Sequence, residues 1–168
     1  APELPVALVV LDTVGDATIR GVEAQATALF SEGFLLDLSY GYTKGEWENV
    51  SPGVGLEDGD EFANVPKQQA SLGAQYSFSM ASGELTLRAD ANYRDKTPLG
   101  GSTAAVVGQQ DAFTLYNASI TYHSPAGWSL SAWGKNLGDK TYVVNLRDAE
   151  QFSPFVGYRE HMLGAPRT

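Results

Sequence analysis

The sequence predicts an all-β chain of long antiparallel strands. Apolar and polar residues alternate with a period of two over five stretches, and short turns alternate with long loops between them. The clearest alternation covers residues 34–43, where Phe34, Leu36 and Leu38 share one face and Asp37 and Ser39 share the other. Because side chains of a strand point alternately to its two faces, each stretch predicts a strand with one apolar and one polar side.

The strands follow from this alternation in chain order. A short apolar run at 7–11 predicts a first strand or its tail, and Gly15-Asp16 predicts a turn. The later strands are expected at about residues 17–30, 34–46, 67–79, 84–95, 112–123, 128–136 and 142–146. The tail, 149–168, is expected to be irregular, with a short strand beginning near its end.

The connections are of two alternating kinds. Short turns are expected at 31–33, 80–83 and 124–127, and long loops at 47–65 and 96–110. Consecutive antiparallel hairpins place all the short turns at one rim of the sheet and all the long loops at the other. Outer-membrane barrels have this asymmetry, with short periplasmic turns and longer extracellular loops.

Aromatic residues gather near both ends of the apolar faces, with Leu and Ala between them. Those near the short turns are Phe30, Phe34, Tyr76, Phe78, Tyr122 and Trp128, and those near the long loops are Tyr40, Tyr42, Tyr93 and Tyr116. Two aromatic belts around an aliphatic band match the interfacial girdles of a membrane barrel. The alternative is a β-sandwich, in which Leu36, Leu72 and Leu87 would pack in a dry interior.

Strand length and composition favour the membrane barrel. The expected strands have about 12 to 14 residues, whereas strands of globular proteins commonly have about 5–6 residues. A strand needs about 9–11 residues to span a bilayer, so the expected strands are long enough. Charged residues make up 18% of the chain, below the roughly 25% of soluble domains. The net charge of −9 argues against a nucleic-acid partner, and the absence of cysteine excludes disulfides. The sequence contains no run of about 18 apolar residues, so it predicts no transmembrane helix.

Four motifs appear in a defined order. Residues 17–23 read ATIRGVE, and Val65-Pro66-Lys67 precedes an alternating strand. The strand from Trp128 ends in Lys135-Asn136-Leu137, and the chain closes with GAPRT at 164–168. Over about residues 15–168 this order resembles the barrel of the TonB-dependent outer-membrane receptors.

The resemblance implies a fold, a location and partners. Members of the family have a 22-stranded barrel with an N-terminal plug domain and a TonB box. We therefore expect residues 1–168 to form the C-terminal part of such a receptor, an up-and-down transmembrane β-barrel segment of about seven or eight strands. The plug domain and the final strand would be absent, and the chain truncated at both ends. The expected location is the bacterial outer membrane. The expected partners are outer-membrane lipid, the rest of the barrel and plug, TonB, and a small-molecule ligand such as a ferric siderophore.

Two groups of residues are candidates for function. Lumen-facing polar residues could contact a passing substrate or the plug, but a cross-strand charge ladder that fills the interior is the favoured explanation. These residues are Asp37, Arg88, Asp90 and Arg94. The acidic residues of the first long loop offer oxygen ligands for calcium but lack EF-hand spacing, so a solvated extracellular loop is expected; they are Glu57, Asp58, Asp60 and Glu61.

The sequence offers no catalytic machinery. His123 and His161 lack a second histidine or a carboxylate at metal-ligand spacing, and no nucleophile motif or phosphate loop occurs. We expect no enzyme activity, no cofactor and no metal. The leading hypothesis is a fragment of a TonB-dependent uptake receptor. The alternatives are a complete eight-stranded outer-membrane barrel of structural or adhesive type and a soluble β-sandwich binding module.

Overall fold

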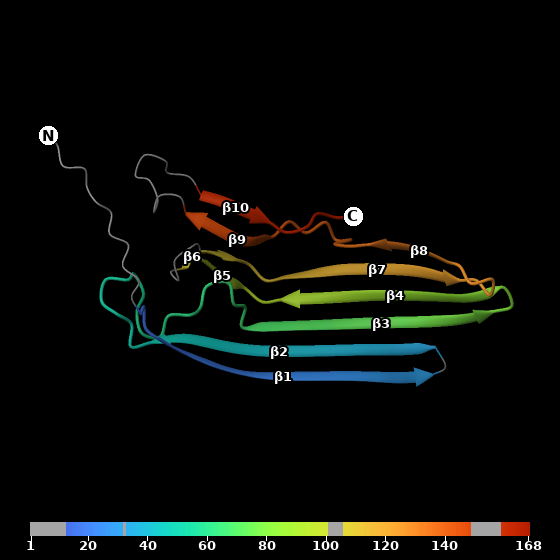
Figure 1. The fold of residues 1–168 in the computed structure, drawn as a ribbon, viewed down its shortest axis with the longest axis horizontal. Coiled ribbons are helices and arrows are strands. Elements are labelled where there is room, and N and C mark those ends of the chain that lie inside the picture. Colours follow the sequence, from blue (N-terminus) through green and yellow to red (C-terminus); the bar gives the residue numbers. More distant parts are fainter. Residues whose placement is uncertain (1–12, 32, 101–105, 149–158) are drawn as a thin grey trace.

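The computed structural model describes residues 13–31, 33–100, 106–148 and 159–168 (Figure 1). In this part of the chain the regular elements are strands. Their bounds are β1 Asp16–Ser31, β2 Phe34–Glu48, β3 Gln68–Met80, β4 Gly83–Arg94, β5 Thr97–Gly100, β6 Val106–Gln110, β7 Phe113–His123, β8 Ser129–Gly134, β9 Val143–Asp148 and β10 Arg159–Leu163. The same residues contain no helix with the length and hydropathy of a membrane span.

Six strands form one antiparallel sheet in the order β1-β2-β3-β4-β7-β8. Each strand pairs with the next one in this order, as in an up-and-down meander. The turns after β1, β3 and β7 lie at one end of the sheet, and the longer connections lie at the other (Figure 1). The predicted all-β antiparallel fold and the separation of short turns from long loops are therefore confirmed.

The strand limits agree with the sequence prediction to within two residues. The strand β8 is the shortest of the sheet, with the 6 residues 129–134 where 128–136 were expected. The remaining sheet strands have 11 to 16 residues, enough to cross a bilayer. The strand expected at 7–11 lies outside the described residues.

The second long loop, expected at 96–110, contains strands that the sequence did not predict. Residues 97–110 contain the hairpin strands β5 and β6, in which Leu99 pairs with Gly108. The small residues of this segment give no alternating pattern, so its pairing depends on contacts with β9 rather than on local periodicity. The expected strand at 142–146 is β9, and it pairs with β10. The first long loop folds back on β2, since Glu46 and Glu61 form an antiparallel bridge.

Side-chain burial is concentrated at the long-loop end. Among the described residues, the buried apolar side chains are Leu99, Phe113 and Leu146, and Leu99 is only 2% exposed. On the six-stranded sheet Leu72 is 45% exposed and Leu87 is 38% exposed. A β-sandwich would enclose these leucines in a dry core, so the apolar face of the sheet is of the kind that meets lipid.

The sheet is open within the described residues. β1 pairs only with β2, and β8 pairs only with β7, so no ladder joins the first and last strands of the sheet. A complete eight-stranded barrel requires that ladder, because unpaired edges cannot lie in lipid. The sheet is therefore a segment of a larger barrel wall. Beyond the end of β8, Lys135 and Thr168 exchange backbone hydrogen bonds of 2.9 and 3.2 Å.

The two faces predict opposite responses to a charge at neighbouring positions of β1. Ala26 lies on the apolar face, paired with Leu38, and Gln25 lies on the polar face, paired with Ser39. In a membrane barrel built with this sheet, Ala26→Lys should destabilise the folded state by about 2–4 kcal/mol, because it places an ammonium group in lipid. Gln25→Lys should leave the folded fraction unchanged. The folded fraction of each variant is measured from the heat-modifiable band of outer-membrane preparations on a gel. Equal folded fractions for the two lysine variants would contradict the assignment of the faces.

Candidate functional site

Three of the four predicted lumen residues form one ion-pair network on the polar face, here called the Arg88 triad. The Arg88 guanidinium donates to Asp37 Oδ2 at 3.1 Å and to Asp90 Oδ1 at 2.7 and 3.0 Å. Thr27 on β1 donates to the other oxygen of Asp37 at 3.2 Å. The triad thus links β2 and β4, Thr27 extends the network to β1, and both carboxylates offset the charge of Arg88.

Gly73 makes this geometry possible. Asp37 on β2, Gly73 on β3 and Asp90 on β4 are register partners in one row across the sheet. The Arg88 side chain lies over Gly73, where an added Cβ would be 2.5 Å from Nη2 of Arg88 and 3.0 Å from Oδ1 of Asp90. A side chain at position 73 would therefore stand between the two carboxylates.

Hydroxyl pairs continue the polar face along the strands. Ser39 and Ser71 are register partners with oxygens 2.6 Å apart, and Ser77 and Thr86 repeat this at 3.0 Å. Thr121 and Ser131 form a third pair at 3.0 Å. Cross-strand pairs of this kind stabilise a sheet and satisfy their own polar atoms. The charge-ladder explanation therefore fits the Arg88 triad and its surroundings.

Arg94, the fourth predicted residue, is separate from the triad. It is the last residue of β4 and lies on the same face, between its register partners Gln69 and Phe113. Its Nε is buried without a hydrogen-bond partner. The adjacent carboxylate, Asp95, accepts from Tyr93 Oη and from the Lys96 amide, so it does not pair with Arg94.

The acidic loop is organised by its own carboxylates. Asp58 accepts from the Val50 amide at 2.8 Å, and Asp60 accepts from the Glu57 amide at 2.8 Å. Glu61 forms a 2.5 Å ion pair with Lys67, and this contact raises the pKa of the Lys67 ammonium. Within the described ranges, no group of three His, Asp or Glu side chains is arranged to hold a metal ion.

Aromatic packing holds the first loop on β2. The rings of Trp47 and Phe62 meet edge to face, with centroids 5.0 Å apart. Phe62 lies over Gly45, where an added Cβ would be 2.5 Å from the ring. The amide of Trp47 also donates to the Asp60 carbonyl at 3.0 Å. The loop is therefore packed against the sheet, and its acidic residues lie at the long-loop end.

Sequence reasoning missed a group of apolar residues at the long-loop end, here called the rim cluster: Leu99, Phe113, Tyr142 and Leu146. Phe113 and Tyr142 stack with ring centroids 4.6 Å apart. Gly108, the register partner of Leu99, lies against Leu146. Gln110 Oε1 accepts from the Val143 amide at 2.7 Å and so ties β6 to β9. These contacts join segments far apart in sequence, and no local pattern predicted them.

Asn136 was quoted in a motif but not recognised as a structural residue. It is 4% exposed and has a left-handed φ of 49°. Its side-chain amide donates to the carbonyls of Lys140 and Ala165 at 2.9 and 3.2 Å, and its Oδ1 accepts from the Lys140 amide. One buried amide therefore holds the turn after β8 and the C-terminal segment together.

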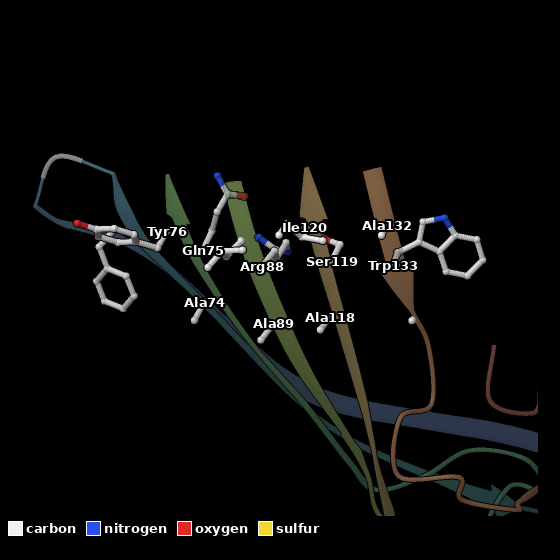
Figure 2. Close-up of a pocket in the computed structure, with 13 residues that line it drawn as sticks. Ala74, Gln75, Tyr76, Arg88, Ala89, Ala118, Ser119, Ile120, Ala132 and Trp133 are labelled. Atoms are coloured by element: carbon white, nitrogen blue, oxygen red, sulfur yellow. The ribbon is translucent and has the colours of Figure 1, made fainter. Parts of the chain in front are cut away.

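A shallow groove of about 550 Å³ is lined mainly by residues of the apolar face, together with Gln75, Arg88, Ser119 and Trp133, which form one register row of the polar face. Figure 2 shows Ala74, Ala89 and Ala118 in a row across neighbouring strands, with Tyr76 and Trp133 at the two ends of the pocket. Near the short turns, the rings of Phe30, Phe34, Tyr76 and Phe78 make successive contacts with centroids 4.4 to 6.3 Å apart. Tyr122 and Trp128 add a further pair at 5.4 Å. The aromatic residues predicted near the short turns therefore form two groups of contacting rings.

A sequence model of the family described as TonB dependent receptor-like, beta-barrel matches residues 4–137. The chain belongs to this family. Its members are outer-membrane proteins of Gram-negative bacteria, and they are transport receptors rather than enzymes. The resemblance seen in the sequence motifs is thereby confirmed. No curated protein matches the chain.

Solved structures of receptors share the fold. The ferric yersiniabactin uptake receptor FyuA from Yersinia pestis superposes with a TM-score of 0.76 at 18% identity, over 92% of this chain and 22% of that receptor. The siderophore receptor PiuA from Acinetobacter baumannii gives 0.70 at 22% identity, over 91% and 21% of the two chains. BauA, the ferric preacinetobactin receptor of the same organism, gives 0.70 at 26% identity with the same coverage. The chain thus spans about a fifth of the length of these receptors.

Gly73→Ala should weaken the Arg88 triad. The new methyl group displaces the Arg88 guanidinium from Asp90, so we expect a loss of about 1 kcal/mol in the free energy of unfolding of the full-length receptor. Gly41→Ala is the matched control on the same face, because nothing lies within 4 Å of a Cβ added there. It should be neutral or stabilise by about 0.5 kcal/mol. Urea unfolding in detergent measures both, and equal midpoints would show that the triad does not depend on Gly73.

Asn136→Ala should destabilise the receptor by about 2 kcal/mol, since the carbonyls of Lys140 and Ala165 and the Lys140 amide lose their buried partner. Asn136→Gly retains the left-handed backbone and removes the same hydrogen bonds, so it separates the two effects. In thermal unfolding experiments we expect Asn136→Gly to show most of the loss of stability that Asn136→Ala shows. If Asn136→Gly has wild-type stability, backbone conformation and not hydrogen bonding explains the residue.

Proposed function

We propose that this chain forms part of the barrel wall of an outer-membrane receptor that takes up a scarce nutrient, a ferric siderophore. Energy for transport would be relayed from the inner membrane through TonB. The observation that carries the proposal is the shared fold over more than nine tenths of the chain with a ferric yersiniabactin uptake receptor, a siderophore receptor and a ferric preacinetobactin receptor.

The two faces of the sheet support this role. The apolar face meets the surrounding lipid, and the polar face, with the Arg88 triad, lines a water-filled lumen. A wall of this kind separates a polar solute from the bilayer. The long loops and the rim cluster lie at the end where a ligand would enter from outside the cell.

The rest of the receptor belongs to the same proposal. The plug domain, the final strand and the remaining barrel strands would come from parts of the receptor outside residues 1–168. The open edges of β1 and β8 support this, because each edge needs a neighbouring strand inside a membrane. The outer membrane is then the location, and lipid, plug, TonB and the ferric chelate are the partners.

The proposal is tested in the full-length receptor, expressed in a bacterium that lacks its own siderophore receptors. Cells are supplied with carboxylate, catecholate and hydroxamate chelates loaded with radioactive iron. We expect saturable uptake of at least one chelate, and loss of this uptake when TonB is deleted. A correctly inserted receptor that takes up none of the chelates, or that does so without TonB, would contradict the proposal.

A further inference from the structure

The two arginines of the polar face differ in one respect. Arg88 is held between two carboxylates, whereas Arg94 makes no ion pair or hydrogen bond with the described residues. Placing a charged group in a partly buried position without a partner costs free energy. Ionisable groups that a membrane protein keeps inside its wall usually face a water-filled path and serve function. Arg94 therefore needs an explanation that the charge ladder does not give.

Two amide side chains adjoin Arg94 and are also free of partners in the described structure. Gln69 is its register partner on β3, and Asn92 precedes it on the same face of β4. Both line a polar hollow of about 320 Å³, whose other lumen-side residues are Glu23, Ser39, Gly41 and Ser71. Gly41 leaves the hollow open, while Ser39 and Ser71 bond to each other. Arg94 does not itself line the hollow, but it is the register partner of Gln69 at its edge, so the unused amide donors of Gln69 and Asn92 lie next to Arg94 in the sheet.

Charge favours an anion at this side. Glu23 lies in the same row as Arg94 but three strands away, with Gly41 and Gln69 between them. Three strand spacings are about 14 Å, which exceeds the screening length of about 8 Å at physiological ionic strength. Glu23 therefore compensates little of the charge of Arg94. Asp95, the next residue in the chain, keeps its charge while it accepts from the Tyr93 hydroxyl and the Lys96 amide, and within the described residues it forms no ion pair with Arg94.

Position connects this group with ligand entry. Arg94 ends β4 at the long-loop end, and its other register partner, Phe113, belongs to the rim cluster. The Arg88 triad lies further along the same strand, toward the short turns. A solute that enters from the long-loop end would therefore reach Arg94 before it reaches the triad.

We propose that Arg94, with the amides of Gln69 and Asn92, binds an anionic oxygen group of the transported ligand as it enters the lumen. A guanidinium group binds a carboxylate through two parallel hydrogen bonds, and amides donate to the remaining lone pairs. This assignment rests on the proposed uptake function. It makes Arg94 a binding residue and leaves Arg88 a structural one.

The test compares receptor variants in the uptake experiment, with half-saturation and maximal rate measured separately. Wild type should transport a carboxylate-type, net anionic ferric chelate. Arg94→Gln should raise the half-saturation concentration for it by about 10- to 100-fold, the loss expected for charge-assisted hydrogen bonds, with little change in maximal rate. Arg94→Lys keeps the positive charge, so its half-saturation concentration should lie between those of wild type and Arg94→Gln. Arg20→Gln is the control and should leave the half-saturation concentration unchanged. Arg20 is the register partner of Lys44 and lies on the face of the sheet opposite to Arg94.

The outcomes separate the two proposals. If wild type takes up no chelate, the uptake function fails and the Arg94 site fails with it. If uptake occurs but Arg94→Gln leaves half-saturation unchanged, or if only neutral chelates are transported, the Arg94 site alone is wrong. A fall in maximal rate at unchanged half-saturation would assign Arg94 to the plug instead. The heat-modifiable band corrects each rate for the amount of folded receptor, and Arg88→Gln should lower that amount.

Discussion

The separation of two solvents by one layer of strands is the constraint on which the rest of the structure depends. In lipid every backbone amide and carbonyl must find a partner within the protein, and an antiparallel ladder supplies these partners to each interior strand. Because side chains alternate across the strand, the same ladder turns Leu72 to one solvent and Ser71 to the other. A sheet with no second layer is stable under this constraint only when its apolar face meets acyl chains.

The polar face satisfies this constraint in two ways. Along most of its length it consists of paired groups, such as Ser39 with Ser71 and Arg88 with Asp37 and Asp90. At the long-loop end the pairing stops, and Arg94, Gln69 and Asn92 keep unused donors beside an open hollow. A barrel wall needs rigidity along its span and adaptable polar groups at its mouth, and this chain places the two kinds of residue accordingly.

The sequence predicted what depends on local periodicity. The period of two and the turn residues predicted the six sheet strands and the separation of short turns from long loops. They also predicted that Asp37, Arg88, Asp90 and Arg94 share one face of the sheet. The sequence did not predict what depends on long-range contacts. The β5–β6 hairpin has no alternating pattern, and the stack of Phe113 on Tyr142 joins residues that only the folded connections bring together. The structure places Asp37, Arg88, Asp90 and Arg94 on one face of the sheet, but their division into a triad and a separate Arg94 required the geometry.

The most direct test of the central claim measures the solvent on each face of β3. Residues 1–168 contain no cysteine, so a single cysteine for a spin label can be introduced at each position from 69 to 76 of the full-length receptor in membranes, after any cysteine elsewhere in the receptor has been replaced by serine. Collision rates with oxygen, which concentrates in lipid, and with a water-soluble nickel complex are compared at each site. The two-solvent account predicts high oxygen access at Ala70, Leu72, Ala74 and Tyr76 and low oxygen access at the residues between them. If the label at Leu72 is sealed from both reagents, or if oxygen access does not alternate, the apolar face does not meet lipid.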